Sequence, residues 1–467
     1  MNNVFLQKWT HSLPKARGVY VVGGTLRDLL LGLRPADCDL ATESDPLDYA
    51  QRLARSTEGR LVPLGKPGKM VYRVITAGVV YDVCSVEGGS ISADLKRRDF
   101  TINAIALDID SGKILDVTGG LEDISSGCIR MVSQKAFDAD PLRLLRAYRI
   151  GASLGFDIEP STVAAICKRA DRICATAAER IREELAKFFQ NAASYTYLLQ
   201  MAQSGLLFSI FPELESLQGC TQNSYHHHDA WHHTLAAYRA LEELLTAPRW
   251  TQRRFFELTR SVSLHGGMLK FAMLLHDIGK PLTRAGQNGS SVHFYGHQKQ
   301  GALLVGTIAD RLRCSLTEKK QLCFLVENHM RPMQLFLLDR HLRMTPRARA
   351  RFFVKCGQQA PDILLMALAD HGGKSASGHS PSGGFTTFIL DLFDQYRHGA
   401  RRRLEMPLPI NGHDLIHDLG LHPSPLFSHI LAEIREALLT GAVTDRASAL
   451  ALSAEIAGRK TEQQVDK

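Results

Sequence analysis

The sequence lacks any apolar run long enough to cross a membrane. Such a span needs roughly 20 consecutive apolar residues, whereas the hydrophobic residues, 45% of the 467, are interrupted throughout by the 22% that are charged. The N-terminal stretch MNNVFLQKWTHSLPKARGVY has no apolar core followed by small residues, so we expect no secretory signal peptide. These absences argue against a membrane partner and favour a packed, cytoplasmic protein.

The sequence also lacks paired cysteines. Its nine cysteines are scattered singly and form no CxxC motif. An odd, dispersed set of this kind is typical of reduced thiols in the cytoplasm and not of a disulfide framework.

Charge, by contrast, is plentiful, with 56 basic residues against 48 acidic ones. The net charge is +8, and basic residues cluster at Lys96-Arg97-Arg98, within residues 340–351 and at Arg401-Arg402-Arg403. Any one cluster could be a solvated surface. Together they favour a polyanionic partner such as nucleic acid.

The residue pattern changes along the chain, which is too long for one ordinary domain. Up to about residue 135, short β-branched runs alternate with turns and helical stretches; the pattern is helical from Pro141 and rich in histidine beyond residue 216. We therefore predict an α+β protein with a mixed-sheet head (1–135), an all-α neck (136–215), a helical body (216–380) and a helical tail (381–467) with a disordered C-terminus.

Two carboxylates lie close together near the start of the head. In DCDLAT, Asp37 and Asp39 would share one face of a strand while Cys38 faces the other. Adjacent carboxylates repel each other unless a cation lies between them, and hard oxygen ligands suit Mg²⁺. The pair is therefore a candidate magnesium site.

A double glycine precedes this pair, between an expected strand, VYVV, and an expected helix. Without side chains, Gly23 and Gly24 would let the backbone approach a phosphate at the positive end of that helix. Arg27 in the first turn could add a forked contact to a triphosphate. A tight turn beside an acidic surface would explain the glycines alone, but not the ordered glycines, arginine and aspartates together.

These residues resemble the class II tRNA nucleotidyltransferases and bacterial poly(A) polymerases, whose head is polymerase-β-like. GGTLRDLLLGLRPADCDL is similar to the first motif of the family, and four others follow in order: RRDFTINAIALD (97–108), DVTGGLEDI (116–124), ADPLRLLRAYR (139–149) and AERIREEL (178–185). The resemblance implies an enzyme that adds nucleotides to the tRNA 3′ end without a template. Its partners would be tRNA and CTP, with ATP as an open second substrate, and pyrophosphate would be released.

The resemblance also implies roles for single residues. Asp37 and Asp39 would hold Mg²⁺, and Asp82 on a neighbouring strand would be the third catalytic carboxylate. Asp140 and Arg143 would imitate a base-pairing edge, although an ordinary ion pair is the alternative there and for Arg98 with Asp99. The implied nucleotide-binding residues are Gly23, Gly24, Arg27, Arg98, Asp140, Arg143, Arg146 and Arg149.

One departure from the family concerns nucleotide specificity. Only residues 84–96 separate the strand of Asp82 from Arg97, where CCA-adding relatives carry a long flexible loop. The short connection resembles the CC-adding members, which add two cytidines and leave the adenosine to a partner enzyme. A full CCA-adding or A-adding enzyme and a poly(A) polymerase are the alternatives, the last less well matched because no aromatic residues follow TINA.

A second group of residues, in the helical body, resembles the HD phosphohydrolase superfamily. The matching positions are His233, His276, Asp277 and Asp370, with His297 and His329 where binuclear members place further ligands. Imidazoles and carboxylates suit a divalent transition metal, or Mg²⁺ at the oxygen-rich end. This domain would either hydrolyse 2′,3′-cyclic or 2′-phosphates or serve only as a tRNA-binding body.

Three functions from different classes follow from these two groups. We expect tRNA 3′-end nucleotidyl transfer with an attached HD domain. The others are a phosphohydrolase whose head serves in RNA binding, and an RNA-binding scaffold with both sites inactive. Both carboxylate sets are complete, which disfavours the second and the third function. The pattern makes no prediction of oligomeric state.

Overall fold

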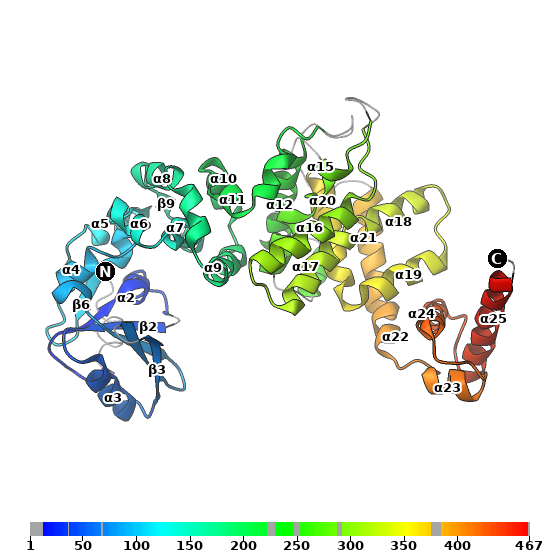
Figure 1. The fold of residues 1–467 in the computed structure, drawn as a ribbon, viewed down its shortest axis with the longest axis horizontal. Helices are drawn as coiled ribbons and strands as arrows, with labels where there is room; N and C mark the ends of the chain where they lie inside the picture. Colours follow the sequence, from blue (N-terminus) through cyan, green and yellow to red (C-terminus); the bar gives the residue numbers. More distant parts are fainter. Residues whose placement is uncertain are drawn as a thin grey trace. The chain divides into compact units, whose positions relative to one another are not determined.

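The protein is described by a computed structural model, which covers residues 13–35, 37–66, 69–221, 229–246, 253–262, 264, 266–286, 292–374 and 384–465. The chain divides into two compact units, Met1–Ile210 and Phe211–Lys467. Figure 1 shows a mixed sheet in the first unit and helices in the second. The predicted α+β class, a mixed-sheet head followed by helices, is confirmed. The four-part division at residues 135, 215 and 380 stays a prediction.

The first unit is built on a seven-stranded sheet with the order β3-β4-β5-β2-β1-β6-β7. Its strands are β1 (Val19–Val22), β2 (Asp37–Thr42), β3 (Arg60–Lys66), β4 (Lys69–Ile75), β5 (Val80–Ser85), β6 (Ile105–Asp108) and β7 (Ile114–Asp116). Neighbouring strands pair antiparallel except for β2 and β5, which are parallel. A separate two-stranded sheet joins β8 (Cys128–Ile129) and β9 (Asp157–Ile158).

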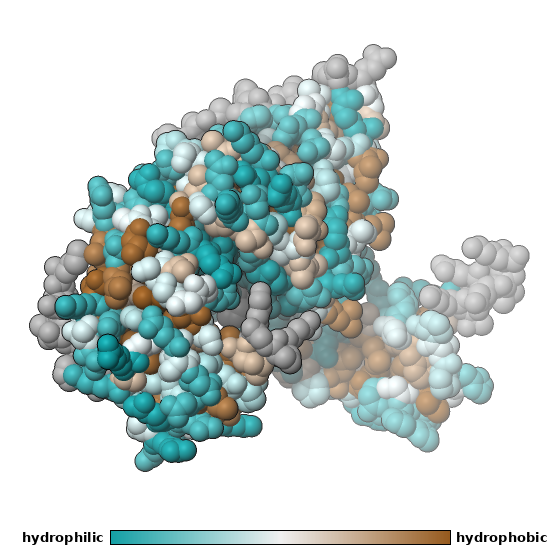
Figure 2. Space-filling model, turned by 60° about the vertical axis from the view of Figure 1, so that its left-hand side comes forward, coloured by the Kyte–Doolittle hydropathy of each residue, from teal (hydrophilic) through white to brown (hydrophobic). Residues whose placement is uncertain are grey.

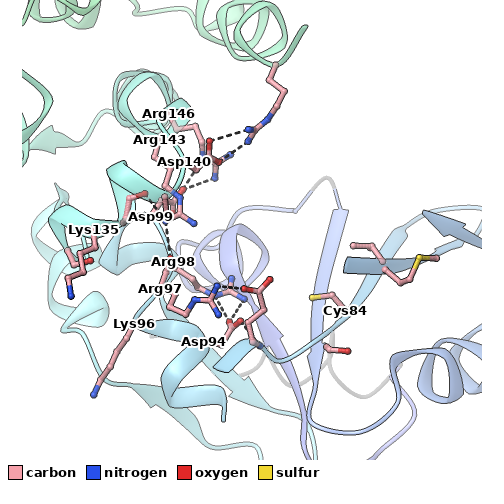
Figure 3. Close-up of a pocket in the computed structure, with 18 residues that line it drawn as sticks. Cys84, Asp94, Lys96, Arg97, Arg98, Asp99, Lys135, Asp140, Arg143 and Arg146 are labelled. Carbon is pink, nitrogen blue, oxygen red and sulfur yellow. Dashed lines mark hydrogen bonds and ion pairs between the residues drawn. The ribbon is translucent and has the colours of Figure 1, made fainter. Parts of the chain in front are cut away.

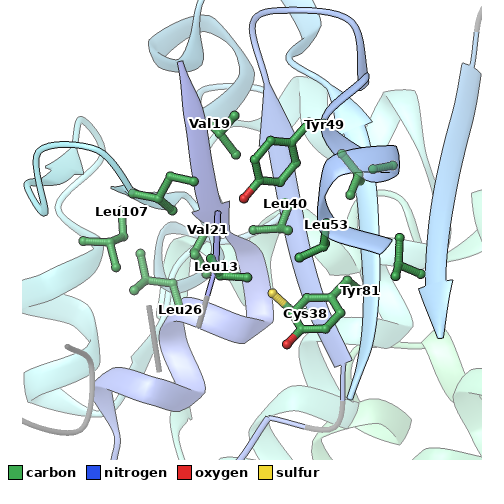
Figure 4. Close-up of a cluster of buried hydrophobic side chains, with 14 of the residues drawn as sticks. Leu13, Val19, Val21, Leu26, Cys38, Leu40, Tyr49, Leu53, Tyr81 and Leu107 are labelled. Atoms are coloured by element: carbon green, nitrogen blue, oxygen red, sulfur yellow. The ribbon is translucent and has the colours of Figure 1, made fainter. Parts of the chain in front are cut away.

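Alternation along the strands divides the apolar residues between two faces of the sheet. On one face, Val21, Leu26, Leu40 and Leu53 belong to a buried cluster that joins the sheet to helices α2 (Gly23–Leu30) and α3 (Pro46–Ser56) (Figure 4). On the other face, Val22 and Ala41 pack with α4 (Ile91–Leu95). Since Cys38 and Leu40 belong to the first cluster, Asp37 and Asp39 lie on the second face.

The rest of the first unit is helical. Its further α-helices are α5 (Gly120–Ser126), α6 (Gln134–Ala139), α7 (Leu142–Leu154), α8 (Pro160–Cys167), α9 (Ala178–Gln190), α10 (Tyr195–Gln203) and α11 (Leu206–Ile210). Short 3₁₀ segments lie at Glu87–Gly89, Thr101–Asn103 and Ala170–Ala175. Helix α7 packs against α9, and both carry charged residues of the family motifs.

The second unit is all-helical in its described residues. Its α-helices are α12 (Ala230–Thr246), α13 (Arg253–Arg260), α14 (Gly266–Leu275), α15 (Lys280–Thr283), α16 (His297–Arg311), α17 (Leu316–Asn328), α18 (Arg331–Arg340), α19 (Pro346–Cys356), α20 (Ala360–Gly372), α21 (Gly384–Gln395), α22 (Arg401–Glu405), α23 (Gly412–His417), α24 (Pro425–Thr440) and α25 (Arg446–Val465). Two 3₁₀ segments, Pro212–Leu217 and Gly357–Gln359, and a π-helical turn, Tyr396–Ala400, complete it.

The end of the chain differs from the sequence-based expectation. The sequence predicts disorder in residues 458–467, but residues 458–465 continue helix α25, and the last two residues lie outside the described ranges. Arginine, lysine, glutamate and glutamine dominate there, and these residues have good helix propensity. Ile434 of α24 and Ile456 of α25 share a separate apolar core that supports the two helices.

The surface agrees with the absence of long apolar runs. The face visible in Figure 2 is largely hydrophilic, with apolar residues in separate patches. Within the described ranges, every helix is too short or too polar to span a bilayer.

Candidate functional site

A row of charged side chains crosses three strands of the head. Asp39 on β2 lies in register with Asp82 on β5, and Asp82 lies in register with Arg73 on β4. Register pairs on adjacent strands hold their Cβ atoms close together. The sheet thus brings Asp82 next to the aspartate pair, where the sequence placed it.

The surroundings of Asp39 disfavour a bare negative charge there. Burial, with repulsion from Asp37 and Asp82 that Arg98 only partly offsets, raises the pKa of Asp39 to about 6. Asp37 is exposed at the end of the same face. Two carboxylates with a third beside them are a donor set that fits Mg²⁺, so Asp37 and Asp39 could hold the predicted cation.

The glycine turn makes room for this arrangement. Gly23 has a φ of +70°, and a Cβ atom there would lie 3.2 Å from Oδ2 of Asp39 and 3.1 Å from Nη1 of Arg98. Thr25 fixes the neighbouring strand, because its Oγ1 accepts a hydrogen bond from the Asp39 amide (2.8 Å) and donates to the Asp37 carbonyl (3.2 Å). A side chain at residue 23 would therefore displace the charged groups of the row.

Arg27 lies beneath this turn with protein partners. Its buried guanidinium donates from Nη1 to Oδ1 of Asn103 (2.7 Å) and from Nε to Oδ1 of Asp28 (2.8 Å). A forked contact to a triphosphate would have to replace these bonds. Arg27 therefore supports the turn in this structure, a role that the motif did not predict.

A polar pocket adjoins the row (Figure 3). Cys84 and Ser85, which follow Asp82 on β5, form part of its wall, and Arg98 reaches both the pocket and Asp39. The pocket's basic lining residues are Lys96, Arg97, Arg98, Lys135, Arg143, Arg146 and Arg180. A hollow with so many cations suits a polyanion such as a triphosphate.

The ion pairs in the wall differ from those that the sequence suggested. Arg98 pairs with Asp94 (2.8 Å), one helical turn earlier, and not with Asp99. Asp99 instead accepts two hydrogen bonds from Arg146. Although burial opposes its charge, Arg146 and Asn103 hold the pKa of Asp99 well below its ordinary value.

Asp140 does not lie on the helix that carries the three arginines. It has extended backbone (φ −148°, ψ 98°) between α6 and α7, because the residue before a proline is pushed away from helical geometry. Its carboxylate accepts hydrogen bonds from Arg180 of α9, from Nη1 at 3.1 Å and Nη2 at 2.8 Å. Only Arg143, Arg146 and Arg149, spaced three residues apart, lie on α7.

The three arginines of α7 have separate partners. Arg143 donates from Nη1 to the carbonyls of Arg97 (2.9 Å) and Ala136 (3.2 Å). Arg149 is bound to Glu184 of α9 (2.8 Å) and is not among the residues that line the pocket. Of the predicted nucleotide-binding residues, Arg98, Asp140, Arg143 and Arg146 line the pocket, and the two predicted base-selecting residues, Asp140 and Arg143, are among them.

In the second unit, the six predicted side chains of the helical body come together and are buried. They are His233 (α12), His276 and Asp277 (after α14), His297 (first residue of α16), His329 (after α17) and Asp370 (α20). Two sets of donor atoms could each hold a metal ion, and both include Asp277: one with His233 and His276, the other with His297 and His329.

The histidines of this HD cluster are oriented as ligands. In each, Nδ1 lies near a backbone carbonyl, at 3.3 Å for His233, 2.7 Å for His276, 2.9 Å for His297 and 2.7 Å for His329. Fixing the proton on Nδ1 leaves the Nε2 lone pair for a metal. The Nε2 atoms of His297 and His329 lie 3.4 Å apart, an approach that a shared cation would explain.

The charge states in the HD cluster also suit a divalent cation. Burial lowers the pKa of His233 and His297 and that of His329 to about 3, so these imidazoles are neutral. Burial opposes the charge of His276 too, but Asp277 and Asp370 raise its pKa to about 10. A metal would take the place of that proton, so the residues present fit the predicted ion.

Lys280 is a part of the HD cluster that the sequence reasoning missed. Its Nζ lies 2.6 Å from Oδ2 of Asp277, and its side chain is buried. Gly279 beside it allows the start of α16 to approach, since a Cβ atom there would lie 2.2 Å from the His297 carbonyl oxygen. The signal for Lys280 was its place in the string HDIGK (276–280). The signal for Arg180 was its place in AERIREEL (178–185).

Known proteins resemble this chain along most of its length. The family model of the Poly A polymerase head domain matches residues 19–86 and 67–130, the probable RNA and SrmB-binding site of polymerase A matches 155–218, and the HD domain matches 226–371. An A-adding tRNA nucleotidyltransferase of Deinococcus radiodurans is 33% identical over 437 residues, which cover 92% of this chain and 93% of the relative. The chain belongs to the tRNA nucleotidyltransferase family.

Other members of the tRNA nucleotidyltransferase family agree in coverage. A CC-adding tRNA nucleotidyltransferase of Synechocystis is 30% identical over 443 residues, 93% of each chain. The solved Thermotoga maritima CCA-adding enzyme complexed with tRNA is 22% identical, with a TM-score of 0.60 over 94% of this chain and 91% of that one. A CCA-adding enzyme with CTP gives 0.62 at 22% identity, over 95% and 90%. These structures share the fold, and the predicted enzyme class is confirmed.

Proposed function

We propose that this tRNA nucleotidyltransferase extends the tRNA 3′ end with cytidines and stops before the terminal adenosine. The observation that carries the proposal is the short connection between β5 and Arg97. In the CCA-adding members of the family that the sequence resembles, a long flexible loop at this place accompanies the change of nucleotide specificity from cytidine to adenosine. We propose that the protein acts in the cytoplasm, with tRNA and CTP as its partners.

The structure of this connection supports the proposal, because its residues are tied down. Ser90 caps helix α4 by accepting a hydrogen bond from the Ala93 amide (3.2 Å). Asp94 accepts one from the Glu87 amide (3.2 Å) and is paired with Arg98. A segment this short and this bonded has little slack for the movement that a change of specificity would need.

The names of the relatives leave the specificity open. One relative is named A-adding, others are named CC-adding, and Mannheimia succiniciproducens has a multifunctional CCA protein that is 28% identical over 377 residues. Support for cytidine therefore comes from the connection and not from the names.

In this proposal, the residues of the head divide the work of nucleotidyl transfer. Arg98 and Lys96 would bind the triphosphate, while Asp140 and Arg143 would meet the base edge and penalise the wrong base by leaving its groups unpaired. Asp37 and Asp39 would hold Mg²⁺, which when bound neutralises the charge of the transferring phosphate. Asp82 would keep the row aligned for attack by the RNA 3′-hydroxyl.

Two tRNA substrates test this proposal. With tRNA that ends at the discriminator base and CTP alone, we expect the addition of two nucleotides. With tRNA that already ends in CC and ATP alone, we expect no extension. Efficient extension of the second substrate would refute the proposal and favour a full CCA-adding or A-adding enzyme.

We propose a second activity, metal-dependent phosphoester hydrolysis by the HD cluster, on the strength of its oriented Nε2 atoms. A cation held there would activate water, and Lys280, beside Asp277, would attract a phosphate. The expected substrates are 2′,3′-cyclic or 2′-phosphorylated nucleotides. Asp277→Asn should remove hydrolysis and leave nucleotide addition intact, with Asp310→Asn, at an exposed position of α16, as control. Two results would contradict this proposal: hydrolysis that survives Asp277→Asn, or no hydrolysis with any of Mg²⁺, Mn²⁺, Ni²⁺ and Co²⁺. The HD domain would then serve only as a tRNA-binding body.

A further inference from the structure

Arg73 ends the charged row of the head, next to Asp82. We infer that Arg73 supplies the positive charge that a second divalent cation would otherwise bring to the three carboxylates, so that the head holds one protein-bound cation. The inference rests on the proposed use of Asp37 and Asp39 as metal ligands. It makes Arg73 a positioning residue, acting through Asp82.

The contact between Arg73 and Asp82 is a two-point fork. Nε of Arg73 donates to Oδ1 of Asp82 at 2.8 Å, and Nη2 donates to Oδ2 at 2.7 Å. The two residues are direct register partners on antiparallel strands, so the sheet itself sets their separation. Such parallel bonds orient a carboxylate more firmly than a single bond can.

The fork weakens Asp82 as a metal ligand. An ionised carboxylate has about four acceptor positions, and here one on each oxygen is taken by a fixed cation. The electrostatic attraction that would draw a metal to Asp82 is already met by the guanidinium. Asp37 and Asp39 have no comparable arginine fork among the described residues, because Arg98 is bound to Asp94.

The charges of the row lead to the same conclusion. Asp37, Asp39 and Asp82 would together carry about three negative charges, and Arg73 reduces the sum to about two, the charge that one divalent ion balances. The hydrogen bonds to Asp82, together with coulombic attraction from Asp82 and more weakly from Asp37 and Asp39, raise the pKa of Arg73, so all three carboxylates stabilise its charge.

The position of Arg73 allows a clean substitution. Its side chain is 41% exposed on a strand near the edge of the sheet, so a neutral replacement leaves the apolar clusters intact. Arg60 on the adjacent strand β3 provides a matched control: it is an exposed arginine whose register partner is Ile75 and not a carboxylate.

Counting bound Mn²⁺ tests the inference without relying on activity. Full-length protein is mixed with a non-hydrolysable CTP analogue, and free Mn²⁺ is measured by electron paramagnetic resonance. For each protein, the number of Mn²⁺ ions bound by the same protein carrying Asp39→Asn is subtracted. The difference excludes ions bound elsewhere in the chain. We expect one head-bound Mn²⁺ in the wild type and in Arg60→Met, and two in Arg73→Met.

Arg73→Lys, which keeps the charge but loses the fork, should still bind one Mn²⁺. If Arg73→Met does not fold, Arg73→Gln takes its place as the neutral variant. Two head-bound ions in the wild type, or an unchanged single ion in the neutral variant, would overturn the inference. No tRNA is present, so the count is independent of whether the enzyme adds cytidine or adenosine.

Discussion

Arg146 donates two hydrogen bonds to the same carboxylate oxygen of Asp99, from Nε at 2.9 Å and from Nη2 at 2.8 Å. The bond joins helix α7 to the chain that leads from the short connection into β6. Asp99 also accepts hydrogen bonds from the Asn103 side chain (3.0 Å) and from the backbone amide of Phe100, the next residue in the chain (2.8 Å). Both residues line the pocket, and the carboxylate of this ion pair is buried and bonded at both oxygens.

This pair should contribute to stability in a pH-dependent way. Since the pKa of folded Asp99 is depressed, its contribution is present above the unfolded value of about 3.9 and is lost as the pH falls further, toward the folded pKa. Asp99→Asn should lower the free energy of unfolding by about 3 kcal/mol at pH 7, because it removes the nearer charge partner of Arg146 and leaves it only Glu184, at 3.5 Å. Urea unfolding at pH 7 and near pH 3 measures both effects.

The exposed pair of Arg97 with Glu87 is the control for this prediction. Their side chains are 58% and 53% exposed, so Glu87→Gln should cost less than about 1 kcal/mol. An equal loss for Asp99→Asn and Glu87→Gln would contradict the importance of the buried pair.

Arg180 should affect the choice of nucleotide through Asp140. Its two bonds hold the carboxylate in place, so Arg180→Met should reduce the discrimination between CTP and UTP about tenfold and slow total addition less. Competition between the two nucleotides on one tRNA measures this ratio. Arg172→Met, which removes an exposed arginine bound to Asp138, is the matched control. A uniform loss for both nucleotides would assign Arg180 to the phosphates.

The sequence could predict those features of the head that depend on residues close together in the chain. The aspartate pair, the glycine turn and the strand of Asp82 follow from local alternation and motif order, and the sheet places all of them as expected. The partners of Asp99, Asp140 and Asp82 could not be predicted in this way. Each depends on how separate helices or strands pack, which no local pattern specifies.

The HD cluster shows the same limit. The resemblance to the HD superfamily indicated its six members, because the spacing of their histidines and aspartates is similar to that of the superfamily. It did not indicate Lys280, whose role depends on the turn after α14, nor the carbonyl that fixes each Nδ1. These details come from backbone geometry.

Metal content should follow the two donor sets of the HD cluster. Because Asp277 belongs to both, Asp277→Asn should remove about two bound ions per chain, whereas His329→Gln should remove about one. Plasma mass spectrometry of protein dialysed against Mn²⁺ or Ni²⁺ measures this. His398→Gln, in the π-helical turn of the second unit, should change nothing. Equal metal content in all three variants would contradict the assignment.

Gly23 should tolerate no side chain. Gly23→Ala would impose a Cβ at φ +70°, at a strain cost of about 1–2 kcal/mol, and would crowd Asp39 and Arg98. We expect weaker CTP binding, measured by calorimetry. Gly32→Ala is the control: it imposes the same strain at φ +72°, but its new Cβ meets nothing within 4 Å, so binding should change much less. Equal effects at the two glycines would contradict the role of the turn.

The most direct test of the account is to sequence the 3′ ends of tRNA after incubation with CTP, ATP, Mg²⁺ and the enzyme. The starting tRNA should end at the discriminator base, and the wild type should be compared with Asp37→Ala/Asp39→Ala and with Asp277→Asn. We predict products that end in two cytidines for the wild type and Asp277→Asn, and no extension for the double variant. Products that end in CCA, or robust extension by the double variant, would contradict it.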